Sequence, residues 1–198
     1  MAELGIGGCF GEGALIQNEV RGATVVAAGD VTLFQLKRES FTELTEKYLK
    51  VRYRLRELHR QRKTESIENS IEHGLLKNAS FLAGAGGDLV SELAQHLETN
   101  NCAKGDVLIR EGDEDASFFL IEVGIVEVSK GGSRITELGP GACFGEGALF
   151  SRNPRSATVT ALTDTSCFVL GKSGFDRIIS RYPVFGKRLE EIHAARAK

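Results

Sequence analysis

The chain has 198 residues, of which 41% are hydrophobic, and a formal net charge of −2 at pH 7. This length can bury one good core or two small ones, and the near-neutral charge argues against a general nucleic-acid-binding protein. No apolar run approaches the roughly 20 residues of a membrane span, and no signal-peptide pattern opens the chain. We therefore expect a cytoplasmic protein without membrane association. Its four cysteines lack metal-ligand spacing and are expected to be free thiols.

The first strongly patterned segment lies between Phe41 and Leu58, where apolar residues recur at alternating spacings of three and four. This spacing predicts one helix of about 25 residues. The opposite face of the helix carries Lys47, Lys50, Arg52, Arg54, Arg56, Arg60, Arg62 and Lys63. Such a basic face is either solvated or a surface for an acidic partner.

A shorter helix is expected over Asp88–Glu98, and short strands follow it. Apolar runs separated by glycine-rich turns predict strands at 107–109, 118–121, 126–128, 135–138, 157–162 and 166–170, with Gly131-Gly132 at a hairpin tip. Many short strands of this kind indicate a small barrel or jelly roll. Two further helices are expected over 175–182 and 185–192, separated by Pro183.

One segment of this barrel occurs twice in the chain. Sliding Glu3–Phe41 onto Glu137–Phe175, an offset of 134 residues, leaves about half of the positions identical without a gap. The strongest part pairs CFGEGALIQNEVRGATV with CFGEGALFSRNPRSATV. A repeat this long indicates a duplicated structural unit.

The repeated residues suit a small anionic ligand that carries a sugar hydroxyl. Gly145 lets the backbone approach a ligand closely, and the turn after Glu146 offers unpaired N–H groups to a phosphate. Arg155 adds a planar cationic fork that fits two phosphate oxygens. Glu146 would repel a phosphate, so a neutral hydroxyl such as a ribose 2′-OH is its natural partner. A phosphate and a ribose together indicate a nucleotide.

FGEGAL…PRSATV and FGEGAL…VRGATV resemble the phosphate-binding cassette of cyclic-nucleotide-binding domains. The resemblance implies that Arg155 binds the cyclic phosphate, that Glu146 binds the ribose 2′-OH, and that backbone N–H groups near Gly145, Ala148, Ser156 and Ala157 complete the site. In the first copy these roles fall to Gly11, Glu12, Ala14, Arg21, Gly22 and Ala23. Ligand binding is favoured over a purely structural glycine corner because Glu and Arg are retained in both copies while the loop between them varies.

The resemblance also implies a β-roll or jelly-roll barrel with flanking helices, of the mainly-β α+β class, and cAMP or cGMP as the ligand. Glu127 is either a carboxylate that orients Arg155 or a solvated strand residue. Tyr182, Phe185, Leu189 and His193 either form a lid over the base or simply pack. Ser156 departs from the Thr of cGMP-preferring sites and from the Ala of cAMP-preferring sites, so the base preference stays open.

The expected organisation is one complete copy and one truncated copy joined by a long helix. Residues 1–38 are interpreted as the C-terminal part of a truncated domain, 39–78 as connecting helices and 79–198 as a complete domain. The chain is therefore expected to be a fragment whose first cassette binds weakly. This tandem arrangement resembles the regulatory subunit of cAMP-dependent protein kinase or the regulatory region of cGMP-dependent protein kinase, with a kinase catalytic subunit or fused kinase domain as partner.

Two other classes of protein compete with this interpretation. A metal-dependent enzyme on a similar barrel needs clustered histidine and carboxylate ligands on strands, whereas His59, His73, His96 and His193 all fall in predicted helices. The chain contains no kinase motif either, so we expect a regulatory module that is not an enzyme and needs no cofactor or metal. The remaining alternative is a related interaction module that has lost ligand binding.

Overall fold

The computed structural model describes residues 3–16, 23–75, 78–150 and 153–196. The chain divides into two compact units, residues 1–63 and residues 64–198, called here the N-terminal and C-terminal units. In the described part of the chain no helix is long and apolar enough to cross a membrane.

The described residues of the C-terminal unit contain two four-stranded antiparallel sheets, with strand orders β1-β8-β3-β6 and β2-β7-β4-β5. The strands are β1 (Leu97–Cys102), β2 (Val107–Ile109), β3 (Ser117–Val123), β4 (Val126–Lys130), β5 (Ser133–Leu138), β6 (Cys143–Phe144), β7 (Thr158–Ala161) and β8 (Thr165–Gly171). The predicted strands between 107 and 170 are thus confirmed, and Gly131-Gly132 joins β4 to β5 with positive φ at both residues.

Strand β3 is buried on both faces, which explains its uninterrupted apolar run. Phe119 and Ile121 pack in the cluster between the two sheets, while Phe118 and Leu120 pack in the cluster formed with the helices. Successive strand residues point to opposite faces, so a central strand covered on both sides needs apolar residues at every position. This sheet is therefore the middle layer of the unit.

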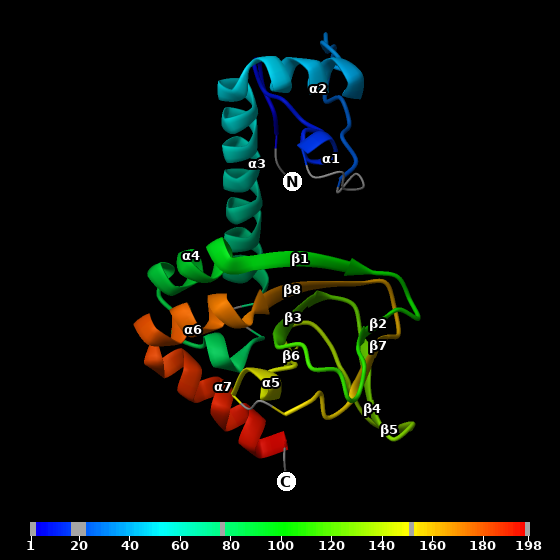
Figure 1. Ribbon diagram of the computed structural model, residues 1–198, viewed down its shortest axis with the longest axis vertical. Helices are drawn as coiled ribbons and strands as arrows, with labels where there is room; N and C mark the ends of the chain where they lie inside the picture. The colour runs from blue at the N-terminus through cyan, green and yellow to red at the C-terminus, as the bar shows by residue number, and fades with distance from the viewer. Residues whose placement is uncertain (1–2, 17–22, 76–77, 151–152, 197–198) are drawn as a thin grey trace. The chain divides into compact units, whose positions relative to one another are not determined.

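Helices α4 (Gly87–His96), α6 (Lys172–Arg181) and α7 (Pro183–Arg196) lie together at one end of the sheets, away from the β4–β5 hairpin (Figure 1). Phe185 of α7 meets Phe81 in the short helical segment η2 (Ser80–Leu82), with ring centroids 6.0 Å apart. Phe185 and Leu189 are both buried in the helix-side core. In this structure these two lid candidates are core residues, which fits the packing interpretation.

The N-terminal unit contains α1 (Gly13–Ile16), α2 (Arg38–Lys47) and the start of α3 (Leu49–Ser70). The prediction of one continuous helix from Phe41 was wrong, because the chain leaves the helical conformation at Tyr48, with φ −123° and ψ 83°. Tyr182 interrupts α6 and α7 in nearly the same way, with φ −126° and ψ 71°. The bounds of α2 match those of α6 at the offset of 134 residues, so the repeat continues beyond Phe41. Helix α3 itself runs further than expected and passes into a π-helical turn, η1 (Ile71–Leu75).

Residues 24–27 and 31–37 match β7 and β8 in the repeat, yet no strand forms in the described residues 23–37. Val26 and Phe34 are instead largely exposed, at 81% and 102%. Strands β7 and β8 are held by β1, β2, β3 and β4 in the C-terminal unit, and the described residues of the N-terminal unit form no strand that could replace these partners. A strand without a partner leaves its backbone groups unpaired.

Two strands were not predicted. The helix expected over Asp88–Glu98 ends at His96, and Leu97 and Glu98 begin β1, which pairs with β8 along its whole length. Strand β6 has only two residues and pairs with β3. The overall class is a mixed α+β fold with two antiparallel sheets and flanking helices.

Candidate functional site

The second copy of the repeated segment forms a tight corner between β6 and a four-residue helix, α5 (Gly147–Phe150). Gly145, at this corner, has φ +79°. A Cβ there would lie 2.6 Å from the carbonyl oxygen of Ser117 and 2.7 Å from Nη1 of Arg155. Both the backbone conformation and the close approach therefore require glycine. Gly11 adopts the same conformation, with φ +80°.

Arg155 lies inside this corner and is 5% exposed. Its Nη1 donates to the carbonyl oxygen of Gly145 at 2.9 Å. Its Nε and Nη2 donate to the two carboxylate oxygens of Asp115 at 3.0 and 2.5 Å. A guanidinium has five N–H groups, so these three bonds leave one N–H on each Nη for a further acceptor.

Asp115 is the carboxylate that orients Arg155, and sequence reasoning missed it. The hydrogen bond from Arg155 holds the pKa of Asp115 below its ordinary value of 3.8, although partial burial opposes the shift. The Asp115 side chain is 52% exposed, so water weakens this ion pair. The available signal was the acidic run 113–115 just before β3, but nothing in that run singles out one of its three carboxylates.

Glu127, which was one candidate for this orienting role, does not contact Arg155. It lies on β4, and its carboxylate is 3.6 Å from Nε of Arg134 on the neighbouring strand β5. The interpretation of Glu127 as the carboxylate that orients Arg155 is corrected in favour of Asp115, which bonds Arg155 directly. Strand alternation directs Val126 and Val128 toward the core. The side chain of Glu127, which lies between them, therefore points to the opposite, partly exposed face of β4.

The backbone of Arg155 is also fixed. Its N–H donates to the carbonyl of Asp113 at 2.8 Å, and its carbonyl accepts from the N–H of Gly112 at 2.9 Å. Ser156 is exposed and Ala157 is half-buried, and the two residues lead directly into β7. Ala148 is half-buried on α5. One loop, 112–115, thus holds the arginine by both its main chain and its side chain.

Glu146 is 5% exposed and receives its charge partner from α7. Nη1 of Arg196 lies 3.3 Å from Oε1 of Glu146 and donates to the carbonyl of Cys143 at 2.7 Å. Nδ1 of His193, one turn earlier on α7, lies 3.8 Å from the same Oε1. A buried carboxylate needs such a partner. Among the lid candidates, His193 is thus close to Glu146, while Tyr182 is half-buried beside Arg181.

Sequence reasoning missed Arg196, although the repeat contained a signal for it. Arg62 stands 134 positions before Arg196, and its Nη1 donates to Oε1 of Glu12 at 2.8 Å and to the carbonyl of Cys9 at 2.7 Å. The first copy therefore has the same arginine–glutamate arrangement inside the N-terminal unit. Following the repeat past Phe41 would have found both arginines.

The structure describes the remaining first-copy residues only in part. The carbonyl of Ala14 accepts a hydrogen bond from Nη2 of Arg38 at 2.7 Å, and Ala23 is exposed. Arg21 and Gly22 lie outside the described residues, so the structure does not report on the phosphate role predicted for them.

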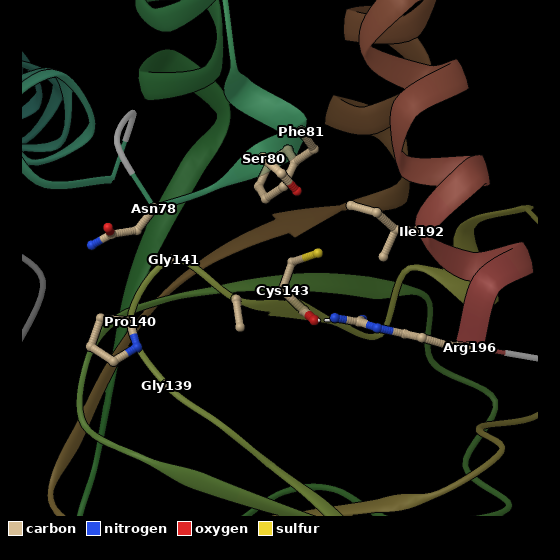
Figure 2. A pocket seen from close by; sticks show the side chains of 10 residues that line it. Asn78, Ser80, Phe81, Gly139, Pro140, Gly141, Cys143, Ile192 and Arg196 are labelled. Carbon is tan, nitrogen blue, oxygen red and sulfur yellow. Dashed lines mark hydrogen bonds between the residues drawn. The ribbon is translucent and has the colours of Figure 1, made fainter.

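Figure 2 shows a cavity of about 380 Å³ next to the corner. It is lined by Asn78, Ser80, Phe81, Gly139, Pro140, Gly141, Ala142, Cys143, Ile192 and Arg196. Arg196 reaches from α7 toward the carbonyl of Cys143 at its rim (Figure 2). Arg155 and Glu146 do not line this cavity, so it is separate from the corner that holds these two side chains.

All four cysteines are free, as expected. Burial raises the pKa of the Cys143 and Cys167 thiols to about 12. The four histidines lie in α3, η1, α4 and α7. No group of three or more His, Cys, Asp or Glu side chains in the described ranges is placed to hold a metal ion.

Together these groups offer three kinds of interaction to a ligand. The buried guanidinium of Arg155 keeps two N–H groups beyond its bonds to Asp115 and Gly145, the glycine keeps the backbone close, and the buried carboxylate of Glu146 stands next to the glycine. Charge-assisted hydrogen bonds of this kind are about twice as strong as neutral ones. The arrangement suits a compact anion with a neutral hydroxyl beside it.

Comparison with known proteins agrees with this chemistry. The family model described as "Cyclic nucleotide-binding domain" matches residues 1–48 and 99–182, together two thirds of the chain. A cAMP-dependent protein kinase regulatory subunit of Debaryomyces hansenii is 37% identical over 88% of this chain. The cGMP-dependent protein kinase of Toxoplasma gondii is 33% identical over 87% of this chain. The chain spans 36% and 16% of the length of these two relatives.

Solved structures show the same fold. The catabolite activator protein of Thermus thermophilus superposes with a TM-score of 0.55 at 24% identity, covering 59% of this chain and 57% of that one. The N-terminal domain of a transcriptional regulator from Streptomyces coelicolor gives a TM-score of 0.53 at 26% identity, covering 62% and 89%. From the matched family model, the chain belongs to the cyclic nucleotide-binding domain family.

Proposed function

We propose that the C-terminal unit binds a cyclic nucleotide, cAMP or cGMP, in the corner formed by Gly145, Glu146 and Arg155. The observation that carries this proposal is the buried Arg155 fork, which Asp115 and Gly145 orient while two of its N–H groups remain for an acceptor. The exocyclic phosphate oxygens would accept from Arg155. The ribose 2′-OH would donate to Glu146, and backbone groups at Ala148, Ser156 and Ala157 would complete the contacts.

We further propose that the chain is part of the regulatory region of a cyclic-nucleotide-dependent protein kinase. Relatives named as regulatory subunits of cAMP-dependent protein kinase match 87–91% of the chain at 34–38% identity, and this supports a kinase catalytic subunit or a fused kinase domain as partner. In this proposal residues 1–38 belong to a second, partial nucleotide-binding domain, 39–78 connect, and 79–198 form the complete domain. Ligand binding would shift α6 and α7 between two arrangements, and a nearly complete switch needs about 10⁴-fold preference for one of them.

Thermal unfolding with cAMP, cGMP and the corresponding non-cyclic 5′-monophosphates tests the binding step. A ligand at 100 times its Kd stabilises the folded state by about 2.7 kcal/mol. For a chain of this size that corresponds to an upward shift of about 5–10 °C. The cyclic nucleotides should give this shift and the non-cyclic forms should not.

The variants Arg155→Lys and Glu146→Ala should reduce the shift. If both bind as the wild type does, the site assignment is wrong. If millimolar cyclic nucleotide gives no shift at all, the chain is an interaction module that has lost ligand binding. Ligand-dependent release of a co-purified kinase catalytic subunit tests the proposed partner separately, once binding has been shown.

A further inference from the structure

His193 and Gly147 form a matched pair at the contact between α7 and α5. A Cβ on Gly147 would lie 2.8 Å from Cε1 and 3.2 Å from Nδ1 of His193. Gly147 is the first residue of α5 and is not among the glycines with positive φ. The imidazole ring, rather than the backbone conformation, therefore requires glycine at this position.

The same pair occurs in the N-terminal unit. A Cβ on Gly13 would lie 2.7 Å from Cε1 of His59, and His59 stands 134 positions before His193. Arg62 then follows His59 by one turn and bonds Glu12, as Arg196 follows His193 and bonds Glu146. In both pairs the arginine is 50 residues from its glutamate. The same glycine, glutamate, histidine and arginine thus recur in the same geometry in both copies of the repeat, which argues against chance packing of one side chain.

The imidazole sets how closely the last turn of α7 approaches the repeated segment. One side of the His193 ring rests on Gly147, and Phe150 stacks near it with ring centroids 6.4 Å apart and an interplanar angle of 26°. Arg196 lies one turn further along α7, so the distance between that turn and the repeated segment decides whether its guanidinium reaches Glu146. Arg196 and His193 both approach Oε1 of Glu146, and Oε2 takes no part in these two contacts.

We propose that His193 is a positioning residue that sets the preference for a ribose over a 2′-deoxyribose, an inference that rests on the proposed nucleotide binding. By resting on Gly147 it holds Arg196 against Glu146. Arg196 then neutralises a carboxylate that would otherwise repel the ligand phosphate, and Oε2 is presented to the 2′-OH. A bulkier residue at 147, or a smaller one at 193, moves this carboxylate without touching Arg155.

Calorimetry with cAMP and 2′-deoxy-cAMP tests the proposal in the whole chain, with cGMP and its 2′-deoxy form if the wild type prefers guanine. The wild type should prefer the ribose form by at least about tenfold, as expected for one hydrogen bond to a charged acceptor. Gly147→Ala and His193→Ala should each lower this ratio below about threefold and change the affinity for the 2′-deoxy ligand less. Gly171→Ala is the matched control, because a Cβ at Gly171 meets no atom within 4 Å. His193→Asn, which keeps a planar polar group, should recover part of the ratio.

The double variant Gly147→Ala/His193→Ala should behave like His193→Ala alone, because the added methyl group has nothing left to displace. Additive effects of the two substitutions, or a wild-type ratio in both single variants, would overturn the proposal while leaving nucleotide binding intact. A wild type that binds neither ligand overturns the proposed function itself, and the two failures are thereby told apart.

Discussion

Replacing Arg155 with lysine should weaken cyclic-nucleotide binding by about 10- to 150-fold. The buried guanidinium uses three N–H groups for Asp115 and Gly145 and has one left on each Nη. Lysine keeps the positive charge but offers a single ammonium, so it cannot serve Asp115, Gly145 and two phosphate oxygens together. The net loss of one charge-assisted hydrogen bond, about 1.5–3 kcal/mol, gives this range.

The affinity is best measured by calorimetry at fixed ionic strength, since salt screens exposed charges. Arg134→Lys is the matched control, because Arg134 is 55% exposed and pairs with glutamates on the β4–β5 hairpin. It should leave the affinity within about twofold. A change below threefold in Arg155→Lys, with cooperative unfolding retained, would refute the assignment of Arg155 as the phosphate ligand.

Three further outcomes are expected. Asp115→Asn should lower the free energy of unfolding at pH 7, and the difference from the wild type should shrink as the pH falls below 3.8. A carboxylate with a lowered pKa stabilises the fold above its ordinary pKa and loses that effect when it is protonated. Urea titrations from pH 7 to pH 2 that give a constant difference would contradict this. Glu146→Gln should weaken binding at least about tenfold while Glu12→Gln leaves it unchanged, and calorimetry that finds two equal sites per chain would refute an impaired first copy. With a thiol reagent at pH 8, the half-buried Cys9 and Cys102 should react before the buried Cys143 and Cys167. The pKa values of about 12 at Cys143 and Cys167 leave few reactive thiolates at this pH. Mass spectrometry of the labelled peptides gives the order of reaction.

Local patterns were enough to predict most of the C-terminal unit. Alternation and glycine turns located β2, β3, β4, β5, β7 and β8, because each of these strands contains apolar residues that face a core. Strand β1 reads LETNNC and has little apolar content. It exists because β8 offers it a complete edge, and that is a tertiary effect that propensity does not record.

The residues of the candidate site likewise divide into those that the sequence pattern could predict and those that depend on the tertiary structure. Gly145, Glu146 and Arg155 could be predicted because the repeat marks them and their chemistry is explicit. Asp115 could not, since its role depends on which of three neighbouring carboxylates the loop turns toward Arg155. The helix break at Tyr48 could not be predicted either, because the first copy has Leu49 at the position of the helix-breaking Pro183 in the second copy. Arg196 was within reach of the repeat, but only over a longer comparison than the obvious similarity suggested.

The way the 112–115 loop holds Arg155 has a kinetic consequence. An arginine side chain carries about 2 kcal/mol of rotamer entropy, and here that freedom is removed by protein groups alone during folding. If the proposed binding holds, an incoming phosphate would meet a preorganised fork and would not wait for the side chain to search its rotamers. Differences in affinity among ligands of this site should therefore arise mainly in how long each stays bound rather than in how fast each arrives.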